Sequence, residues 1–211
     1  GFETILAAAK ILSYGELGGW GDGENVSTHL IPPSQIEFLI VGDGTRRAWL
    51  ESELAKGEYP NVTLLPYQPR SAVPQIYATA DICLVPLKKE TALGTFPSKI
   101  YTIMAARRPV IASTDPHSEL ADLVAAAQCG WIIPPENSAK LTAAIQSAAD
   151  NKITSSTKGG NGYNHIHAHY GRRSVTQMYS QLFSELTEGS HRKAKTKVET
   201  TNEEMRGVSA D

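Results

Sequence analysis

Pro97, Ser98 and Lys99 open a segment with a helical pattern, and their side chains suit the binding of an anion. Proline has a fixed φ and no N–H, so Pro97 fits the first turn of a helix. We expect the amides of Ser98, Lys99 and Ile100 to be free there, at the positive end of the helix dipole. With the Ser98 hydroxyl and the Lys99 ammonium, these amides would hold a diphosphate. The alternative is a plain helix start that carries an exposed lysine.

Two glycines follow the first strand-like apolar run of the chain. Gly42 and Gly44 have the Gly-x-Gly spacing that opens a dinucleotide-binding turn, but Arg47 occupies the place of the third glycine. The next run also ends in Leu65 and Pro66 rather than in an acid that could hold a ribose. A tight turn with exposed amides is therefore the better interpretation, and a purely structural turn is the alternative.

Aromatic and amide side chains follow the second apolar run. Tyr67 and Gln68 could face a planar base, by stacking and by hydrogen bonds to its edge, with Pro69 shaping the turn. A proline-shaped turn into the next helix is the alternative, which the residues alone favour. Further along, Gly94 precedes Phe96 and would let the backbone approach a ligand closely.

These loops connect elements that alternate regularly along the chain. Short β-branched apolar runs predict strands covered on both faces, and the segments between them have helical spacing. The alternation predicts an α/β fold with a doubly wound, Rossmann-like parallel sheet. In such a sheet ligands bind beyond the carboxyl ends of the strands, where the three loops lie. The expected strands are 36–42, 61–65, 81–87, 108–113 and 130–135, and the expected helices are 1–14, 44–57, 71–79, 97–107, 116–127 and 137–150.

The remaining segments differ in composition. Residues 15–35 are predicted to form a surface loop, and residues 151–162 a polar linker that contains glycines. Residues 163–187 carry an apolar stripe at helical spacing, which predicts a long helix. We expect residues 1–187 to form one domain and the polar residues 188–211 to form a disordered tail.

Composition excludes several classes of protein. The 20 basic and 22 acidic residues give a net charge of −2 and no reason to expect nucleic acid as a partner. No apolar stretch approaches the roughly 20 residues of a membrane span. Cys83 and Cys129 lie in apolar surroundings and are expected to be buried, reduced thiols of a cytosolic protein. His165, His167 and His169 would point apart on a helix, so no metal site is predicted.

Several stretches together resemble the C-terminal lobe of a family-4-type glycosyltransferase of the GT-B fold. The similarity is greatest to the bacterial branch that builds surface polysaccharides. It covers about residues 1–187, and its specificity lies in the ensemble of motifs rather than in any single one. The matching stretches are 38–44, 61–62, 77–86, 97–99, 104–112, 115–120, 129–131 and 134–137.

The resemblance implies roles for the candidate residues. Such enzymes have two Rossmann-like lobes, and the nucleotide-sugar donor lies mainly in the C-terminal one. Tyr67, Gln68 and Pro69 would then meet the nucleobase, and the turn at 42–44 would lie beside the donor. Residues 96–99 would hold the diphosphate and the transferred sugar. No metal and no cofactor is implied.

The resemblance also implies a retaining glycosyltransferase in the cytoplasm, with a glycan or lipid-linked acceptor at the inner face of the membrane. Peripheral association with that membrane would involve the N-terminal lobe. Because the sequence starts at Gly1 and goes straight into a helical pattern, we expect a fragment without this lobe. Such a fragment would bind donor without turnover, and its oligomeric state is open.

The chain departs from the family pattern at two acids. The broad family carries two glutamates eight positions apart around the helix that follows Lys99, and the matching positions here are Gly94 and Thr102. The usual contacts with ribose and hexose therefore cannot be transferred, and the catalytic residues stay unassigned. Thr102 remains a candidate donor-binding residue by position, and Glu90 is a candidate substitute for the first glutamate.

Three other functions are alternatives to this one. A degenerate, non-catalytic nucleotide-sugar-binding module would also lack both glutamates. A nucleotide-sugar epimerase shares the two-lobed fold, but it needs acids and a histidine around the sugar, which the sequence does not place. A phosphoryl-accepting receiver domain needs acids at strand ends, whereas the first and second strands expected here end in Gly42 and Leu65.

Overall fold

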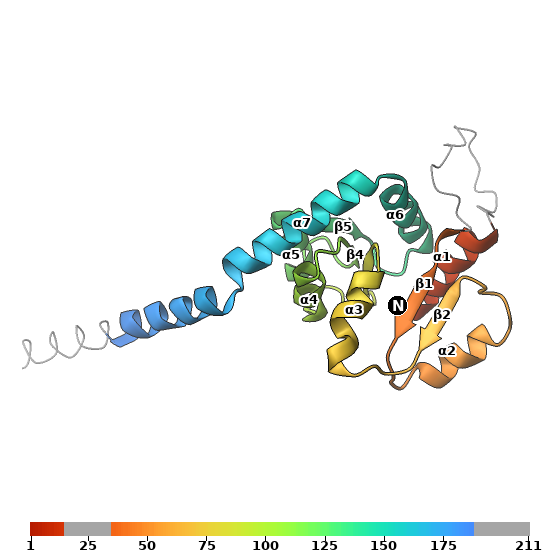
Figure 1. The fold of residues 1–211 in the computed structure, drawn as a ribbon, viewed down its shortest axis with the longest axis horizontal. Coiled ribbons are helices and arrows are strands. Elements are labelled where there is room, and N and C mark those ends of the chain that lie inside the picture. The colour runs from red at the N-terminus through yellow and green to blue at the C-terminus, as the bar shows by residue number, and fades with distance from the viewer. Residues whose placement is uncertain (15–34, 188–211) are drawn as a thin grey trace, which may run out of the picture. The chain divides into compact units, whose positions relative to one another are not determined.

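A computed structural model of the chain describes residues 1–14 and 35–187 (Figure 1). The chain divides into two compact units, residues 1–166 and residues 167–211. The loop expected at 15–35 lies almost wholly outside the described residues, and so does the tail expected at 188–211. The division into a lobe and a tail therefore stays a prediction.

The predicted strands are confirmed, each somewhat shorter than its apolar run. Every pairing among them is parallel, which confirms the α/β fold with parallel βαβ units. The strands are β1 (Phe38–Val41), β2 (Val62–Leu65), β3 (Cys83–Pro86), β4 (Val110–Ser113) and β5 (Gly130–Ile133).

The predicted helices between the strands are also confirmed. Two of them begin at short polar residues that cap the first turn, as Ser118 and Asn137 each accept a backbone amide three residues further on. The helices are α1 (Phe2–Tyr14), α2 (Arg47–Leu54), α3 (Val73–Thr79), α4 (Lys99–Ala105), α5 (Glu119–Ala126) and α6 (Ser138–Asp150), with a 3-10 turn η2 (Arg70–Ala72) before α3.

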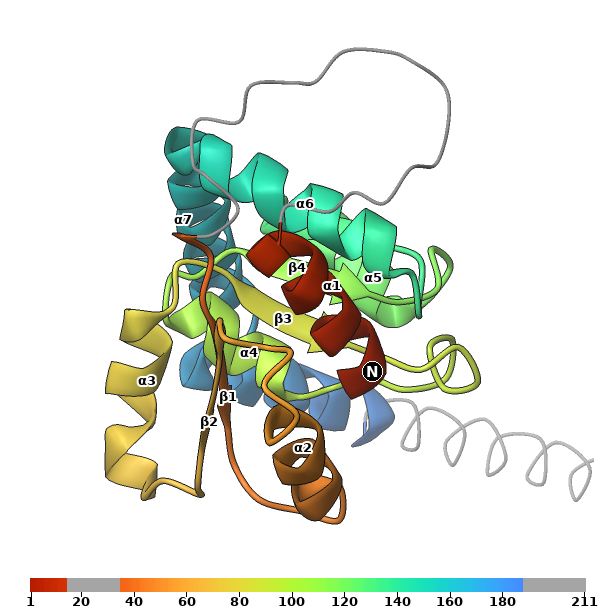
Figure 2. The same ribbon diagram turned by 90° about the vertical axis from the view of Figure 1, so that its right-hand side faces the viewer.

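Hydrogen bonds divide the strands into two sheets. Within the described residues β1 pairs with β2 alone, whereas β4 lies between β3 and β5. In Figure 2, β3 runs across the view while β1 and β2 run down it, so the two sheets are not continuous. Leu39 of β1 keeps 42% of its surface exposed, which shows that the two-stranded sheet is incompletely covered.

Two apolar cores meet at β4. Val110 and Ala112 belong to the first core, with side chains of α4 and α5, and Ile111 belongs to the second, with side chains of α1 and α6. None of the three residues is more than 1% exposed. Successive side chains of a strand point to opposite faces. Helices therefore cover both faces of β4, as its unbroken apolar run predicted.

The linker predicted at 151–162 is wrong, because helix α7 (Lys152–His169) runs through it. Glycine weakens an isolated helix, but here it allows close packing. A Cβ atom added at Gly159 would lie 2.2 Å from the carbonyl oxygen of Arg107. Tertiary contact therefore favours a helix where composition alone indicated a linker.

The long helix predicted at 163–187 is divided. α7 ends at His169, and a second helical segment covers 172–187. The apolar stripe of that segment is exposed, with Phe183 and Leu186 both at 61%. In residues 1–14 and 35–187, no helix combines the length and the apolar character that crossing a bilayer requires.

Candidate functional site

The Pro-Ser-Lys triplet lies at the start of α4, as predicted. Ser98 is the N-cap, with a φ of −57° and no capping bond from its side chain. The Ile100 amide donates to the Pro97 carbonyl oxygen at 3.1 Å, so the expectation of three free amides is wrong. No carbonyl of the described residues accepts the Ser98 or Lys99 amide. Because α4 has only seven residues, most of the positive charge comes from the Lys99 side chain.

The Lys99 ammonium lies in a partly desolvated position. Desolvation by the surrounding protein lowers the pKa of Lys99, and the neighbouring Cys83 thiol opposes this effect. The residue as a whole is exposed, so water screens part of the effect. A cation that has lost part of its hydration interacts more strongly with an incoming anion than a fully hydrated one. Lys99 therefore suits a phosphate group better than an ordinary surface lysine.

Phe96 packs into the protein. Its ring centroid lies 5.5 Å from that of Tyr101, and both side chains pack against the first core. This contact orients the chain just before the triplet and leaves Phe96 half-buried. Thr102 lies on the exposed side of α4.

Gly94 belongs to the loop between β3 and α4. A Cβ atom added there would meet no atom within 4 Å, and the residue needs no positive φ. The backbone at Gly94 therefore faces open space, as a close approach to a ligand requires. Glu90 is exposed in the same loop.

The Gly42–Gly44 turn has the conformation that demands glycine, with φ values of 141° and 147°. Its amides are occupied. The Gly42 amide donates to the Leu65 carbonyl oxygen at 3.2 Å, and the Gly44 amide to Asp43 Oδ1 at 2.8 Å. The expectation of exposed amides is therefore wrong for these two residues, and the structural alternative is favoured for this turn.

Arg47 explains why this turn is closed. Its Nη1 donates to the Gly42 carbonyl oxygen at 2.8 Å and to the Leu65 carbonyl oxygen at 3.3 Å. The guanidinium thereby joins the carboxyl ends of β1 and β2, and its Nε pairs with Glu51 at 2.8 Å. Sequence reasoning identified Arg47 only as a departure from the glycine fingerprint. The signal in the sequence that could have indicated this role was the position of the arginine, a few residues after the end of a strand.

The loop after β2 leaves one side chain open to a ligand. Tyr67 is 70% exposed, so its ring is available for stacking on a base. The Gln68 side-chain amide donates to the Pro66 carbonyl oxygen at 3.2 Å, which leaves it less available for hydrogen bonds with a base. Pro69 is the N-cap of η2, so the proline-shaped turn into the next helix is present.

The candidate residues fall into two groups. The first group follows β1 and β2, and the Gly42–Leu65 hydrogen bond brings its two loops together. The second group, residues 94–102, follows β3. The two groups belong to different sheets. The structure therefore brings residues together within each group, and among the described residues no hydrogen bond joins the two groups.

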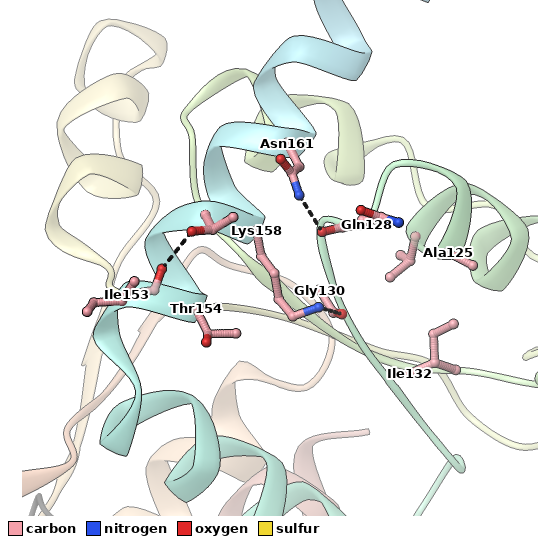
Figure 3. Close-up of a pocket in the computed structure, with 10 residues that line it drawn as sticks. Ala125, Gln128, Gly130, Ile132, Ile153, Thr154, Lys158 and Asn161 are labelled. Carbon is pink, nitrogen blue, oxygen red and sulfur yellow. Dashed lines mark hydrogen bonds between the residues drawn. The ribbon is translucent and has the colours of Figure 1, made fainter.

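A hollow of ≈480 Å³ lies elsewhere, between β5, the end of α5 and α7 (Figure 3). Lys158 lines it, but its ammonium already donates to the Gly130 carbonyl oxygen at 3.1 Å and lies 5.0 Å from the Trp131 ring. Gly130 begins β5, so the hollow lies at the amino end of the sheet, away from the candidate loops. No group of three or more potential metal-ligating side chains occurs in the described part of the chain.

Comparison with known proteins identifies the family. Residues 24–151 match the family described as "Glycosyl transferases group 1". The chain belongs to the group 1 glycosyl transferases. The putative colanic acid biosynthesis glycosyl transferase WcaI of Escherichia coli (strain K12) is 29% identical over 146 residues. That match covers 66% of this chain and 35% of the relative, so the glycosyl transferase chain described here spans about a third of the relative's length.

Solved structures support the same fold. Sucrose-phosphate synthase from Thermosynechococcus elongatus superposes with a TM-score of 0.60 at 23% identity, covering 72% of this chain and 38% of that protein. HepE of Anabaena, solved in complex with UDP-glucose, superposes with a TM-score of 0.60 at 20% identity, and the match covers 72% of this chain and 41% of HepE. At these identities the likeness shows the fold alone. The resemblance to GT-B glycosyltransferases of polysaccharide biosynthesis is thereby confirmed.

Proposed function

We propose that this chain binds the nucleotide-diphosphate sugar donor of a glycosyltransferase, which moves the sugar to a glycan or lipid-linked acceptor. The observation that carries the proposal is the family match over residues 24–151. HepE, which shares the fold, was solved with UDP-glucose. The chain spans 35% of the length of WcaI, so donor binding is the activity that we assign to this part, as the C-terminal lobe of a two-lobed enzyme.

The described residues suggest how the donor would be held. The Lys99 ammonium, with the Ser98 hydroxyl and amide, would bind the diphosphate at the start of α4. The open backbone at Gly94 would face the sugar, and the exposed Tyr67 ring would stack on the base. During transfer the bond from the sugar C1 to the diphosphate oxygen breaks, and C1 forms a bond to the oxygen of an acceptor hydroxyl, which releases its proton. The leaving diphosphate then gains negative charge, which Lys99 would stabilise.

The finer features of the proposal come from the family resemblance. They are retention of the anomeric configuration and a cytoplasmic site of action at the inner face of the membrane. Contact with that membrane and binding of the acceptor would belong to the N-terminal lobe, and the catalytic residues are not assigned. We propose no metal for the diphosphate, for which Lys99 would supply a positive charge.

One observation favours a second candidate, a nucleotide-sugar-binding module without catalysis. Gly94 and Thr102 occupy the positions of the two family glutamates, and Thr102 is exposed at the surface of α4. Neither residue can supply a carboxylate to the ribose or the sugar. Donor binding without transfer in the full-length protein would favour this candidate over the transferase.

Calorimetric titration of the chain with UDP, GDP, UDP-glucose and GDP-mannose tests the proposal. We expect one nucleotide to bind, and Ser98→Ala and Lys99→Ala each to weaken binding, the lysine change by roughly tenfold or more, since hydrogen bonds to charged groups contribute about 1.5–3 kcal/mol. Lys152→Ala, at an exposed lysine that begins α7, is the control and should leave the affinity unchanged. Absence of binding to every nucleotide, or equal binding by all variants, would overturn the proposal.

A further inference from the structure

In the described part of the chain, one hydrogen bond from outside the segment reaches residues 88–95 of the loop between β3 and Pro97. Thr91 and Thr95 make turn bonds within the loop, the Thr91 amide to Lys88 and the Thr95 amide to Thr91. Its exposed residues include Leu93 at 62%, whereas Ala92 is 1% exposed. A loop with one buried side chain and bonds mostly to itself needs an external anchor to keep a single geometry.

Thr114, the residue after β4, supplies that anchor. Its hydroxyl donates to the Ala92 carbonyl oxygen at 2.9 Å. Thr114 is completely buried, and Ser118, whose Oγ lies 2.9 Å from Thr114 Oγ1, is 1% exposed. The three residues form a clasp between the end of β4, the start of α5 and the loop. We call Ala92, Thr114 and Ser118 the loop clasp.

The hydroxyl groups of the loop clasp have separate carbonyl acceptors. Thr114 donates to the Ala92 carbonyl oxygen, and the Ser118 hydroxyl donates to the Asp115 carbonyl oxygen at 2.7 Å. The Ser118 amide donates to the same Asp115 carbonyl, at 3.1 Å. The two hydroxyl oxygens lie in contact with each other, so Ser118 packs against the group that holds the loop. The Ala121 amide donates to Ser118 Oγ at 3.2 Å.

We propose that Thr114 is a positioning residue for the sugar and diphosphate part of the donor site. Its hydroxyl fixes the 88–95 loop, and the loop places Gly94 and the chain that leads into Pro97. The inference rests on the proposed function. A loop that is already ordered binds a ligand without a further loss of conformational freedom. Without the hydroxyl, the Ala92 carbonyl lacks its buried donor, and the loop must open to hydrate it.

Thr114→Val removes the hydroxyl and keeps the shape, whereas Thr114→Ser keeps the hydroxyl. Thr142→Val is the matched control, because Thr142 is a buried threonine of α6 whose Oγ1 has no hydrogen-bond partner. Ser118→Ala is a second variant, which removes the hydroxyl that contacts Thr114 and leaves Thr114 itself unchanged. Its control is Asn137→Ala, which removes an N-cap of the same kind from α6.

The first measurement is limited trypsin digestion, which needs no ligand. Lys88 and Lys89 are exposed cleavage sites at the start of the loop, and Lys56 is an exposed site outside it. We expect Thr114→Val to raise the rate of cleavage at 88–89 relative to that at Lys56 by roughly tenfold, as loss of a buried hydrogen bond predicts. Thr114→Ser should restore the ratio, and Thr142→Val should not change it.

The second measurement is titration with the nucleotide sugar that the wild type binds. Thr114→Val should weaken its binding by roughly tenfold, with recovery in Thr114→Ser. A raised cleavage ratio with unchanged affinity, or neither effect, would overturn the positioning role. If Thr114→Val does not fold, the comparison of Ser118→Ala with Asn137→Ala decides by the same two readouts. A wild type that binds no nucleotide overturns the proposed function and the positioning role with it, and the cleavage ratio still decides whether Thr114 anchors the loop.

Discussion

Gly159 of α7 lies against the turn between α4 and β4, so close that an added Cβ atom would stand 2.2 Å from the Arg107 carbonyl oxygen. Arg107 has a φ of 58°, which few residues other than glycine adopt. Its guanidinium lies 3.9 Å from the ring centroid of Tyr163, also in α7. The turn and the helix therefore constrain each other, and a side chain at Gly159 has no space.

Gly159→Ala should destabilise the protein, since the clashing atom is backbone and cannot rotate away. We expect the free energy of unfolding in urea to fall by about 1–3 kcal/mol. Gly160→Ala is the matched control, because a Cβ atom there would meet nothing within 4 Å. That change should raise the free energy of unfolding by about 0.5–1 kcal/mol through helix propensity. Equal effects of the two changes would contradict the close packing of α7.

Arg47 should contribute to stability by closing the carboxyl ends of β1 and β2. Arg47→Met keeps the length of the side chain but leaves the Gly42 and Leu65 carbonyls without their shared donor. We expect a loss of about 1–2 kcal/mol in the free energy of unfolding. Glu51→Gln breaks only the exposed ion pair to the same arginine and should cost no more than about 0.5 kcal/mol. Similar losses for both variants would show that the carbonyl contacts contribute little.

The fold was largely predictable, because it depends on patterns of neighbouring residues. The run at 110–113 has no alternation, and the structure buries all four of its residues. The failure at 151–162 has a physical cause. Gly159 and Gly162 indicate a linker when only local propensity is considered. In the structure they allow close contact with Arg107 and Cys129, which lie 52 and 33 positions away in the sequence.

The candidate site was predictable only in part. Its loops follow strand ends, and this placement was predictable from topology. Which backbone amides are free depends on partners such as Asp43 Oδ1 and the Pro97 carbonyl, and residue type does not specify these bonds. The role of Thr114 was missed because its partner, Ala92, is a backbone carbonyl in a loop. No pattern of residue types in the sequence indicates a hydrogen bond to a backbone carbonyl in a loop.

The two cysteines should make stability fall at alkaline pH. Burial raises the pKa of both Cys83 and Cys129 to about 11, above the value of about 8.5 expected in an unfolded chain. At a pH below the pKa of the unfolded chain, the thiols are neutral in both the folded and the unfolded protein, and the free energy of unfolding is not reduced by their ionisation. As the pH rises towards 11, only the unfolded chain ionises, so the free energy of unfolding falls, by up to about 3 kcal/mol per thiol.

Urea unfolding between pH 8 and pH 10.5, under reducing conditions, measures this slope. The double variant Cys83→Ala, Cys129→Ala should lose less stability over the same range, because lysines and tyrosines titrate alike in both proteins. An equal fall in the two proteins would show that the thiols ionise as easily in the folded state as in the unfolded one.

Lys99 should make donor affinity depend on pH in an unusual range. Desolvation lowers the pKa of its ammonium. As the pH rises, Lys99 therefore loses its proton earlier than an ordinary lysine, which titrates at a pH of about 10.4. Binding of a diphosphate favours the charged form, and the complex should therefore take up a proton at alkaline pH. We expect affinity for the nucleotide that binds at neutral pH to fall as the pH is raised from 7 to 9.5.

Calorimetry in two buffers of different ionisation enthalpy detects that proton directly. In the wild type, the binding enthalpy at pH 9.5 should differ between the buffers, and the difference should shrink at pH 7. Lys99→Arg keeps its charge throughout this range, so its affinity should depend less on pH, and its enthalpy less on the buffer, than in the wild type, even if the larger side chain weakens binding overall. A wild type as insensitive to pH as Lys99→Arg would place the diphosphate away from this lysine.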